Sequence, residues 1–377
     1  MELFGSSGTR GVANVELTSE LAIDVARAAG AHWEADRVAI ARDTRTTGPM
    51  LVSAVASGLT SVGVSAERLG IVPAPGVQAH AEREGIPAII VTASHNPPAY
   101  NGIKLVGPGG IELNVEELES LESAVLDEEI DLASWDSVGD VTRVEGSNRR
   151  YIEGVRSAID STDIEAADLT VALDPGNGAG TLTSPGFIRD LGCRVVTINA
   201  QPDGHFPGRD PEPVPDNLDG LMRLVRAADA DLGIAHDGDA DRAIFVDERG
   251  EMIDGDTSLA ALAAAELGEG DVVVAAVNVS QRLVDAVDAA DAALDLTPIG
   301  STHIVTRIQE RRDAGDRVPV AGEGNGGVFF PEHRLTRDGA YVGAKFLELL
   351  AAADRPASDV VAPYTDYHLV RENLPYD

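Results

Sequence analysis

The stretch Ala88-Ile89-Ile90-Val91-Thr92-Ala93-Ser94-His95-Asn96-Pro97 joins an apolar run directly to a polar loop. The first four residues are apolar and mostly β-branched, which predicts a short buried strand. A serine at the end of such a strand is a candidate nucleophile, and the adjacent His95 can orient or titrate its hydroxyl. Ser, Asn and Pro are also common turn formers, so this segment alone favours an ordinary turn.

Similar apolar runs lie elsewhere in the chain, and helical patterns separate them. Buried strands are predicted at 38–42, 171–174 and 272–278, and helices at 18–34, 48–63, 217–230 and 256–267. Strands that alternate with helices indicate an α/β protein. The wide spacing of the three strands predicts a repeated α/β domain instead of one sheet.

Three segments suit domain boundaries. They are the acidic stretch 128–140 with a polar turn near Ser147, the turn 247–250, and the proline-bearing segment 355–363. We therefore predict domains at 1–147, 148–249 and 250–363.

The segment Asp237-Gly238-Asp239-Ala240-Asp241-Arg242 carries three carboxylates at alternate positions after an apolar run. Such carboxylates can converge on one hard cation, and oxygen ligands favour magnesium or calcium over zinc. A solvated acidic turn is the simpler alternative. A calcium loop is excluded because its sixth position needs glycine, where Arg242 stands, and because 243–246 predicts a strand. The arginine suits a phosphate beside the metal.

The segment Gly322-Glu323-Gly324-Asn325-Gly326-Gly327 lies between two apolar runs. Its Asn-Gly pair predicts a hairpin turn. A carboxylate and an amide on a tight loop also suit sugar hydroxyls, and both interpretations can hold together.

Lys104 stands out because the chain has only one other lysine, Lys345, among 29 basic residues. An ammonium can release its proton when its pKa is lowered, whereas a guanidinium cannot, so a general acid or base role would explain the lysine. Chance retention is the alternative, since Lys345 lies on what looks like an ordinary helix.

The glycine-rich segment 174–180 resembles a dinucleotide loop only superficially, because its third glycine is out of register and Pro175 interrupts it. We predict a closely packed turn between a strand and a helix.

The formal net charge of −34 excludes nucleic acid and an anionic membrane surface as partners. Acidity with so little lysine favours a high-salt cytoplasm, and a GC-rich genome is the alternative cause. The single cysteine, Cys193, provides no disulfide, and the N-terminus has no basic and apolar leader pattern. A cytoplasmic protein is predicted.

Four motifs, in this order, resemble those of the α-D-phosphohexomutase family, which includes phosphoglucomutases, phosphomannomutases and phosphoglucosamine mutases. They are LFGSSGTRG at 3–11, TASHNP at 92–97, DGDADR at 237–242 and GEGNGG at 322–327. The resemblance covers essentially the whole chain and implies three consecutive similar α/β domains with mixed sheets flanked by helices. The family's fourth domain is absent from the 377 residues, and 364–377 would begin the linker to it.

The resemblance also implies roles for individual residues. Ser94 would carry a phosphoryl group and complete a magnesium site with Asp237, Asp239 and Asp241. Lys104 and His95 would transfer protons, and Arg10 would support the phosphoserine loop. The residues that would bind the substrate are Arg242, Glu323, Asn325 and, in a specificity loop at 300–303, Ser301. Many relatives carry serine where Asn325 stands, although archaeal-type members carry asparagine, so this position leaves the sugar open.

The implied reaction moves phosphate between the 1 and 6 positions of glucose, mannose or glucosamine through a sugar bisphosphate, which also acts as activator. The fourth domain would grip the non-reacting phosphate, and a separate polypeptide could supply it. Two alternatives stay open: a noncatalytic remnant that binds sugar phosphates, and a metal-dependent phosphatase.

Overall fold

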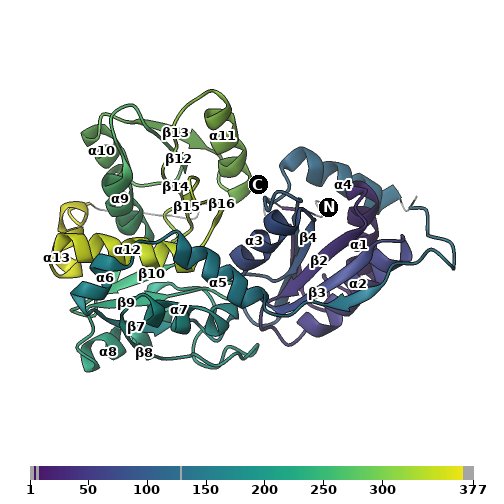
Figure 1. Ribbon diagram of the computed structural model, residues 1–377, viewed down its shortest axis with the longest axis horizontal. Helices are drawn as coiled ribbons and strands as arrows, with labels where there is room; N and C mark the ends of the chain where they lie inside the picture. The colour runs from purple at the N-terminus through teal and green to yellow at the C-terminus, as the bar shows by residue number, and fades with distance from the viewer. Residues whose placement is uncertain (1–3, 6–7, 128–129, 368–377) are drawn as a thin grey trace, which may run out of the picture.

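The computed structural model describes residues 4–5, 8–127 and 130–367 as three α/β domains, each built on its own sheet (Figure 1). The expected class, three consecutive similar α/β domains with mixed sheets, is confirmed. Leu3, Ser6 and Ser7 of the N-terminal motif and residues 368–377 of the predicted linker lie outside the described residues. Among the helices described, none has the length and apolar character that crossing a bilayer requires.

The first sheet has the strand order β1-β5-β4-β2-β3-β6. Its strands are β1 (Thr9–Val12), β2 (Arg37–Arg42), β3 (Ser65–Ile71), β4 (Ala88–Val91), β5 (Tyr100–Val106) and β6 (Val141–Arg143). Its helices are α1 (Ser19–Trp33), α2 (Gly48–Ser61), α3 (Ala74–Glu84) and α4 (Val115–Asp127). The strands from β4 through β2 and β3 to β6 are parallel, whereas β5 and β1 are antiparallel to their neighbours.

The second sheet has the order β11-β10-β9-β7-β8. Its strands are β7 (Thr170–Asp174), β8 (Arg194–Thr197), β9 (Leu232–Ala235), β10 (Ile244–Asp247) and β11 (Met252–Ile253). The helices of this part of the chain are α5 (Ser147–Ser157), α6 (Thr162–Ala167), α7 (Ser184–Asp190) and α8 (Asp219–Ala227). The sheet extends past the predicted boundary at residue 249, because β11 pairs with β10.

The third sheet has the order β13-β12-β14-β15-β16. Its strands are β12 (Val272–Ala276), β13 (Ala293–Thr297), β14 (Ala321–Gly322), β15 (Val328–Phe330) and β16 (Arg334–Arg337). The helices are α9 (Gly255–Glu266), α10 (Gln281–Ala289), α11 (Ser301–Asp313), α12 (Gly339–Ala353) and α13 (Ala357–Val361).

The three sheets share one plan, in which parallel strands, four in the first sheet and three in each of the others, are followed by two antiparallel ones. The connection from the last parallel strand to the first antiparallel strand is β4 to β5, β9 to β10 and β14 to β15 in turn. These three connections contain the TASHNP, DGDADR and GEGNGG motifs. The repeat predicted from spacing is therefore real, and each copy places one motif at the same point of its sheet.

Several predicted element ends differ from the structure by one to three residues. The third strand ends at Ala276 instead of 278. Helix α8 begins at Asp219, after a short 3-10 turn at Pro215–Asn217. Helix α9 is capped by Asp254, whose side chain accepts a hydrogen bond from the Thr257 amide, so Asp256 lies inside its first turn. Thr18 does cap α1, as its side chain accepts from the Leu21 amide.

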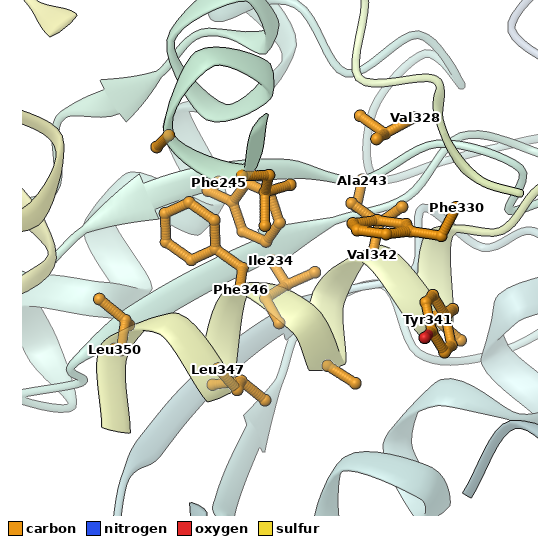
Figure 2. Close-up of a cluster of buried hydrophobic side chains, with 14 of the residues drawn as sticks. Ile234, Ala243, Phe245, Val328, Phe330, Tyr341, Val342, Phe346, Leu347 and Leu350 are labelled. Atoms are coloured by element: carbon orange, nitrogen blue, oxygen red, sulfur yellow. The ribbon is translucent and has the colours of Figure 1, made fainter. Parts of the chain in front are cut away.

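Helix α12 follows β16 of the third sheet in sequence but lies against the second sheet. Its apolar face packs against the second sheet, and the Phe346 ring stacks on Phe245 of β10 with 4.1 Å between centroids (Figure 2). Leu347 and Leu350 belong to the same buried cluster, which also contains Val273 and Val328 of the third sheet. The second and third domains thus share one large hydrophobic cluster.

Candidate active site

Ser94 lies in a turn directly after β4, with its backbone in the left-handed region at φ 48°. Its amide donates to Thr92 Oγ1 at 2.9 Å, and its side-chain hydroxyl donates to Asp237 Oδ2 at 2.6 Å. The left-handed conformation is costly for a residue with a Cβ, and the surrounding contacts hold it. The strand end therefore presents the Ser94 hydroxyl to a carboxylate of the second domain.

Arg45 is completely buried and stabilises the Ser94 turn through hydrogen bonds. Its guanidinium donates to four backbone carbonyls of the turn and the residues that follow, those of Ser94, Asn96, Pro97 and Tyr100. Asp43 pairs with Arg45 at 2.9 Å and accepts a 2.7 Å bond from Thr92 Oγ1. Sequence analysis missed this pair, although two charged residues directly after the buried strand β2 were a usable signal.

The carboxylates of Asp237, Asp239 and Asp241 converge as predicted. Each offers one oxygen within 4.8 Å of the others, and all three residues are buried. Asp239 Oδ1 and Asp241 Oδ1 are buried without a hydrogen-bond partner among the described residues. A buried oxygen without a partner is costly, and the three carboxylates together with the serine oxygen form the hard donor set that suits magnesium. The residues fit the predicted metal.

The glycine-rich segment 174–180 packs against the loop 237–242, which is called the metal loop below. A Cβ on Gly178 would lie 2.4 Å from the Gly238 carbonyl oxygen, so the two backbones approach as only glycine allows. Arg209 pairs with Asp174 at 2.8 Å and donates to the His236 carbonyl at 2.6 Å. The predicted close packing is present, and its partner is the metal loop.

Lys104, on β5, is buried and lies 3.2 Å from both Asp239 Oδ2 and Asp241 Oδ2. Burial alone would lower the pKa of Lys104, but the charges of Asp239 and Asp241 outweigh it and raise the pKa above its ordinary value. The lowered pKa that motivated a general-base role is therefore not found. A lysine in this setting is charged and can donate a proton.

Burial raises the pKa of Asp237 to about 8, and the negative charges of Asp241 and Asp239 add to the effect. For Asp241 burial acts in the same direction, but the cations Arg337 and Lys104 hold its pKa well below the ordinary value. Carboxylates that lie close together and repel each other commonly have pKa values that differ in this way. A bound cation would favour the ionised form of each carboxylate.

His95 and Arg242 lie on opposite sides of the contact between the first and second domains. Arg242 Nη2 donates to His95 Nδ1 at 3.0 Å, which leaves the ring proton on Nε2. Burial, together with the charge of Arg242, lowers the pKa of His95 to about 3, so the imidazole is neutral. Arg10 on β1 reaches the same loop, donating to Asn96 Oδ1 at 3.3 Å, and burial lowers its pKa.

Arg337 at the end of β16 links the metal loop to the GEGNGG loop. Its Nη2 lies 2.6 Å from Asp241 Oδ2, and its Nη1 lies 3.5 Å from Glu323 Oε2. Asn325 donates to Glu323 at 3.2 Å and accepts from the Gly327 amide at 3.0 Å. The loop closes a hairpin between β14 and β15, as predicted. Arg337, which sequence analysis missed, links Glu323 to the metal loop.

Ser301 is the first residue of α11, with Gly300 as its N-cap, so the predicted specificity loop is a helix terminus. Its hydroxyl donates to Glu112 Oε2 of the first domain at 2.9 Å. Glu112 Oε1 in turn lies 3.7 Å from Lys104 Nζ. All the site residues named from sequence therefore belong to one connected set of contacts, to which Glu112, Arg337, Asp43 and Arg45 are added.

Comparison with known proteins agrees with this arrangement. Models of the phosphoglucomutase/phosphomannomutase α/β/α domains I, II and III match residues 1–131, 149–250 and 254–367. The chain belongs to the phosphoglucomutase/phosphomannomutase family. Members of this family are phosphomutases, which are isomerase-class enzymes, and none of the matched models describes a fourth domain.

Individual relatives resemble the chain over nearly its whole length. It is 40% identical to the phosphoglucomutase/phosphomannomutase of Thermococcus kodakarensis, over 97% of this chain and 81% of that protein. It is 36% identical to the phosphoglucosamine/phosphogalactosamine mutase of Sulfurisphaera tokodaii, over 99% of this chain and 82% of that protein. A phosphoglucomutase/phosphomannomutase family structure from Burkholderia thailandensis superposes with a TM-score of 0.84 at 29% identity, covering 97% of this chain and 80% of that one.

Proposed function

We propose that the chain interconverts hexose 1-phosphates and hexose 6-phosphates through a phosphorylated Ser94 and a sugar bisphosphate. The observation that carries the proposal is the 2.6 Å hydrogen bond from Ser94 Oγ to Asp237 Oδ2. It joins the serine turn of one domain to the metal loop of the next, across 143 residues of sequence. A nucleophile at a cation site is what transfer of a phosphoryl group requires.

The transfer exchanges one bond for another. The oxygen–phosphorus bond to the sugar hydroxyl forms, the Ser94 Oγ–phosphorus bond breaks, and one proton passes from the sugar hydroxyl to Ser94 Oγ. We assign this transfer to Lys104, whose ammonium would give its proton to Ser94 Oγ and then, as the neutral amine, take the proton of the sugar hydroxyl, with His95 as the second candidate. Arg10 and Arg242 supply fixed positive charge beside the serine turn.

Asp237, Asp239 and Asp241 with Ser94 would hold magnesium, which when bound neutralises negative charge on the phosphoryl group. Glu323 and Asn325 are proposed to bind sugar hydroxyls, and Ser301 to line the substrate side of Glu112. The names of the relatives include phosphoglucosamine and phosphogalactosamine mutase, so amino sugars belong with glucose and mannose among the sugars to test.

The proposal is tested by incubating the protein with glucose 1,6-bisphosphate and magnesium and measuring its intact mass. One added phosphoryl group, located on Ser94 by fragmentation, is expected. Ser94→Ala should remove both this mass increase and the conversion of hexose 1-phosphates, by at least about a thousandfold, because the group that carries the phosphate is missing.

Two results would argue against a mutase. Phosphate release that survives in Ser94→Ala would favour a metal-dependent phosphatase. A protein that binds the bisphosphate but gains no mass after incubation would favour the noncatalytic alternative. The assay should be repeated with an added fourth domain from a relative, because a separate polypeptide is one of the ways in which that domain could be supplied. It should also be repeated at low and at molar salt to test the predicted high-salt cytoplasm.

A further inference from the structure

A cavity of about 500 Å³ lies in the first domain, between α2 and the strands β2, β3 and β6. Three arginines line it, Arg42, Arg68 and Arg143, together with the hydroxyl residues Ser53 and Thr142. No Asp or Glu lines it, although the chain has 63 acidic residues and only 29 basic ones. The cavity therefore has the opposite charge to the protein as a whole.

The strand register forces two of these arginines together. Arg68 of β3 lies directly opposite Arg143 of β6, and on its other side it lies opposite Ile40 of β2. Like charges directly opposite each other on neighbouring strands destabilise a sheet. An anion that binds between Arg68 and Arg143 would remove this repulsion and stabilise the sheet.

Acidic partners are present nearby but are not used here. Glu67, the residue directly before Arg68 on β3, pairs instead with Arg37 of β2 at 2.6 Å. Within the described part of the chain, Arg42, Arg68 and Arg143 form no ion pair with a carboxylate; Arg42 donates to the Asp43 carbonyl at 2.8 Å. Arg68 Nε is buried with no hydrogen-bond partner among the described residues. The three guanidinium groups have donors to spare.

We propose that this cavity binds a phosphorylated small molecule, with its phosphate held by Arg68 and Arg143 and its remainder against the apolar side chains of Val52 and Val141. Planar guanidinium groups bind phosphate through paired hydrogen bonds, and the volume is in the range of small-molecule sites. The site is distinct from the Ser94 centre. Arg42 lines the cavity, whereas the next charged residues, Asp43 and Arg45, hold the serine turn.

The test is calorimetric titration with inorganic pyrophosphate, without divalent cations, in an Arg242→Ala background that weakens anion binding at the Ser94 centre. Arg68→Ala with Arg143→Ala should reduce the affinity at least about tenfold, because each lost charge-assisted contact contributes strongly. Arg223→Ala is the matched control, since this arginine of α8 is exposed and outside the cavity. It should leave the affinity unchanged.

Stability gives a second readout. Pyrophosphate should raise the melting temperature of the background protein and of Arg223→Ala, but not that of the double variant. The proposal is overturned if pyrophosphate does not bind the background protein, or if the control loses as much affinity as the double variant. Citrate, an anion of similar charge without phosphorus, should bind at least about tenfold more weakly; equal affinity would overturn the assignment of a phosphorylated ligand.

Discussion

The first domain differs from the other two in how it is held in the molecule. Its apolar residues form clusters of their own on the two faces of its sheet, one under α1 and α2 and one under α3. The second and third domains each have a smaller cluster of their own, but they also share one large cluster, which α12 completes (Figure 2). Polar contacts join the first domain to the rest, and Ser94–Asp237 and Ser301–Glu112 are among them.

This difference shows that one set of contacts stabilises the fold, whereas another set brings together the groups of the candidate site. The shared core fixes the metal loop relative to the GEGNGG loop, because apolar packing is strong and does not depend on a ligand. The serine turn meets these loops through charged and hydrogen-bonded groups, whose strength depends on protonation and on metal. The following predictions test the contrast.

The largest expected effect is on unfolding. Phe346→Ala should cost about 3–5 kcal/mol because it empties the shared core, and Leu51→Ala should cost about 2–5 kcal/mol in the first domain's own cluster. Both tryptophans, Trp33 and Trp135, lie in the first domain, so their fluorescence reports it alone.

In denaturant titrations, Phe346→Ala should move the circular-dichroism transition and leave the tryptophan transition in place, whereas Leu51→Ala should move the tryptophan transition. Coincident shifts of both signals in both variants would mean that the three domains unfold as one unit, and the contrast between their cores would not hold.

The next effect concerns pH. With the pKa of Asp237 raised to about 8, magnesium must displace its proton at lower pH. The apparent magnesium affinity should rise about tenfold per pH unit between pH 6 and 8 and then level off, measured by calorimetry. Since the folded pKa exceeds the unfolded value near 3.9, the metal-free protein should also lose stability as pH rises from about 4 through 8.

Asp237→Asn is the control for this prediction, because it removes the proton that titrates. The variant should bind magnesium more weakly and with little dependence on pH. An equally steep pH dependence in Asp237→Asn would assign the titration to another group.

A smaller effect is expected from Arg337, which competes with a metal for Asp241. Arg337→Met should raise magnesium affinity about tenfold, because one cation 2.6 Å from the Asp241 carboxylate is lost. The control is Arg334→Met on the same strand, whose ion pair with Glu82 is away from the metal loop. Weaker binding in Arg337→Met would instead show that this arginine orients the carboxylate.

The smallest effect is expected at that outer ion pair, which joins the first and third domains at 2.8 Å. Because Glu82 is half exposed, a double-mutant cycle of Arg334→Ala and Glu82→Ala should give a coupling below about 1 kcal/mol. A coupling above about 2 kcal/mol would mean that polar contacts between the domains add to stability after all.

The amino-acid sequence by itself determined the α/β class, the repeat and the three chemical loops. Strands such as Ala88–Val91 and Leu232–Ala235 are short apolar runs, and the turns after them depend on a few neighbouring residues, so local patterns are enough to locate them. The prediction that Ser94, Asp237 and Glu323 are site residues rests on motifs of the same short range.

Only the tertiary structure decided which distant groups meet. Arg337 reaches Asp241 across 96 residues, and Arg45 reaches the Pro97 and Tyr100 carbonyls across more than 50. The raised pKa of Lys104 depends on carboxylates of another domain, and the place of α12 depends on the apolar face of a different sheet. Periodicity and spacing describe a residue's neighbours in sequence, whereas burial and charge depend on neighbours in space.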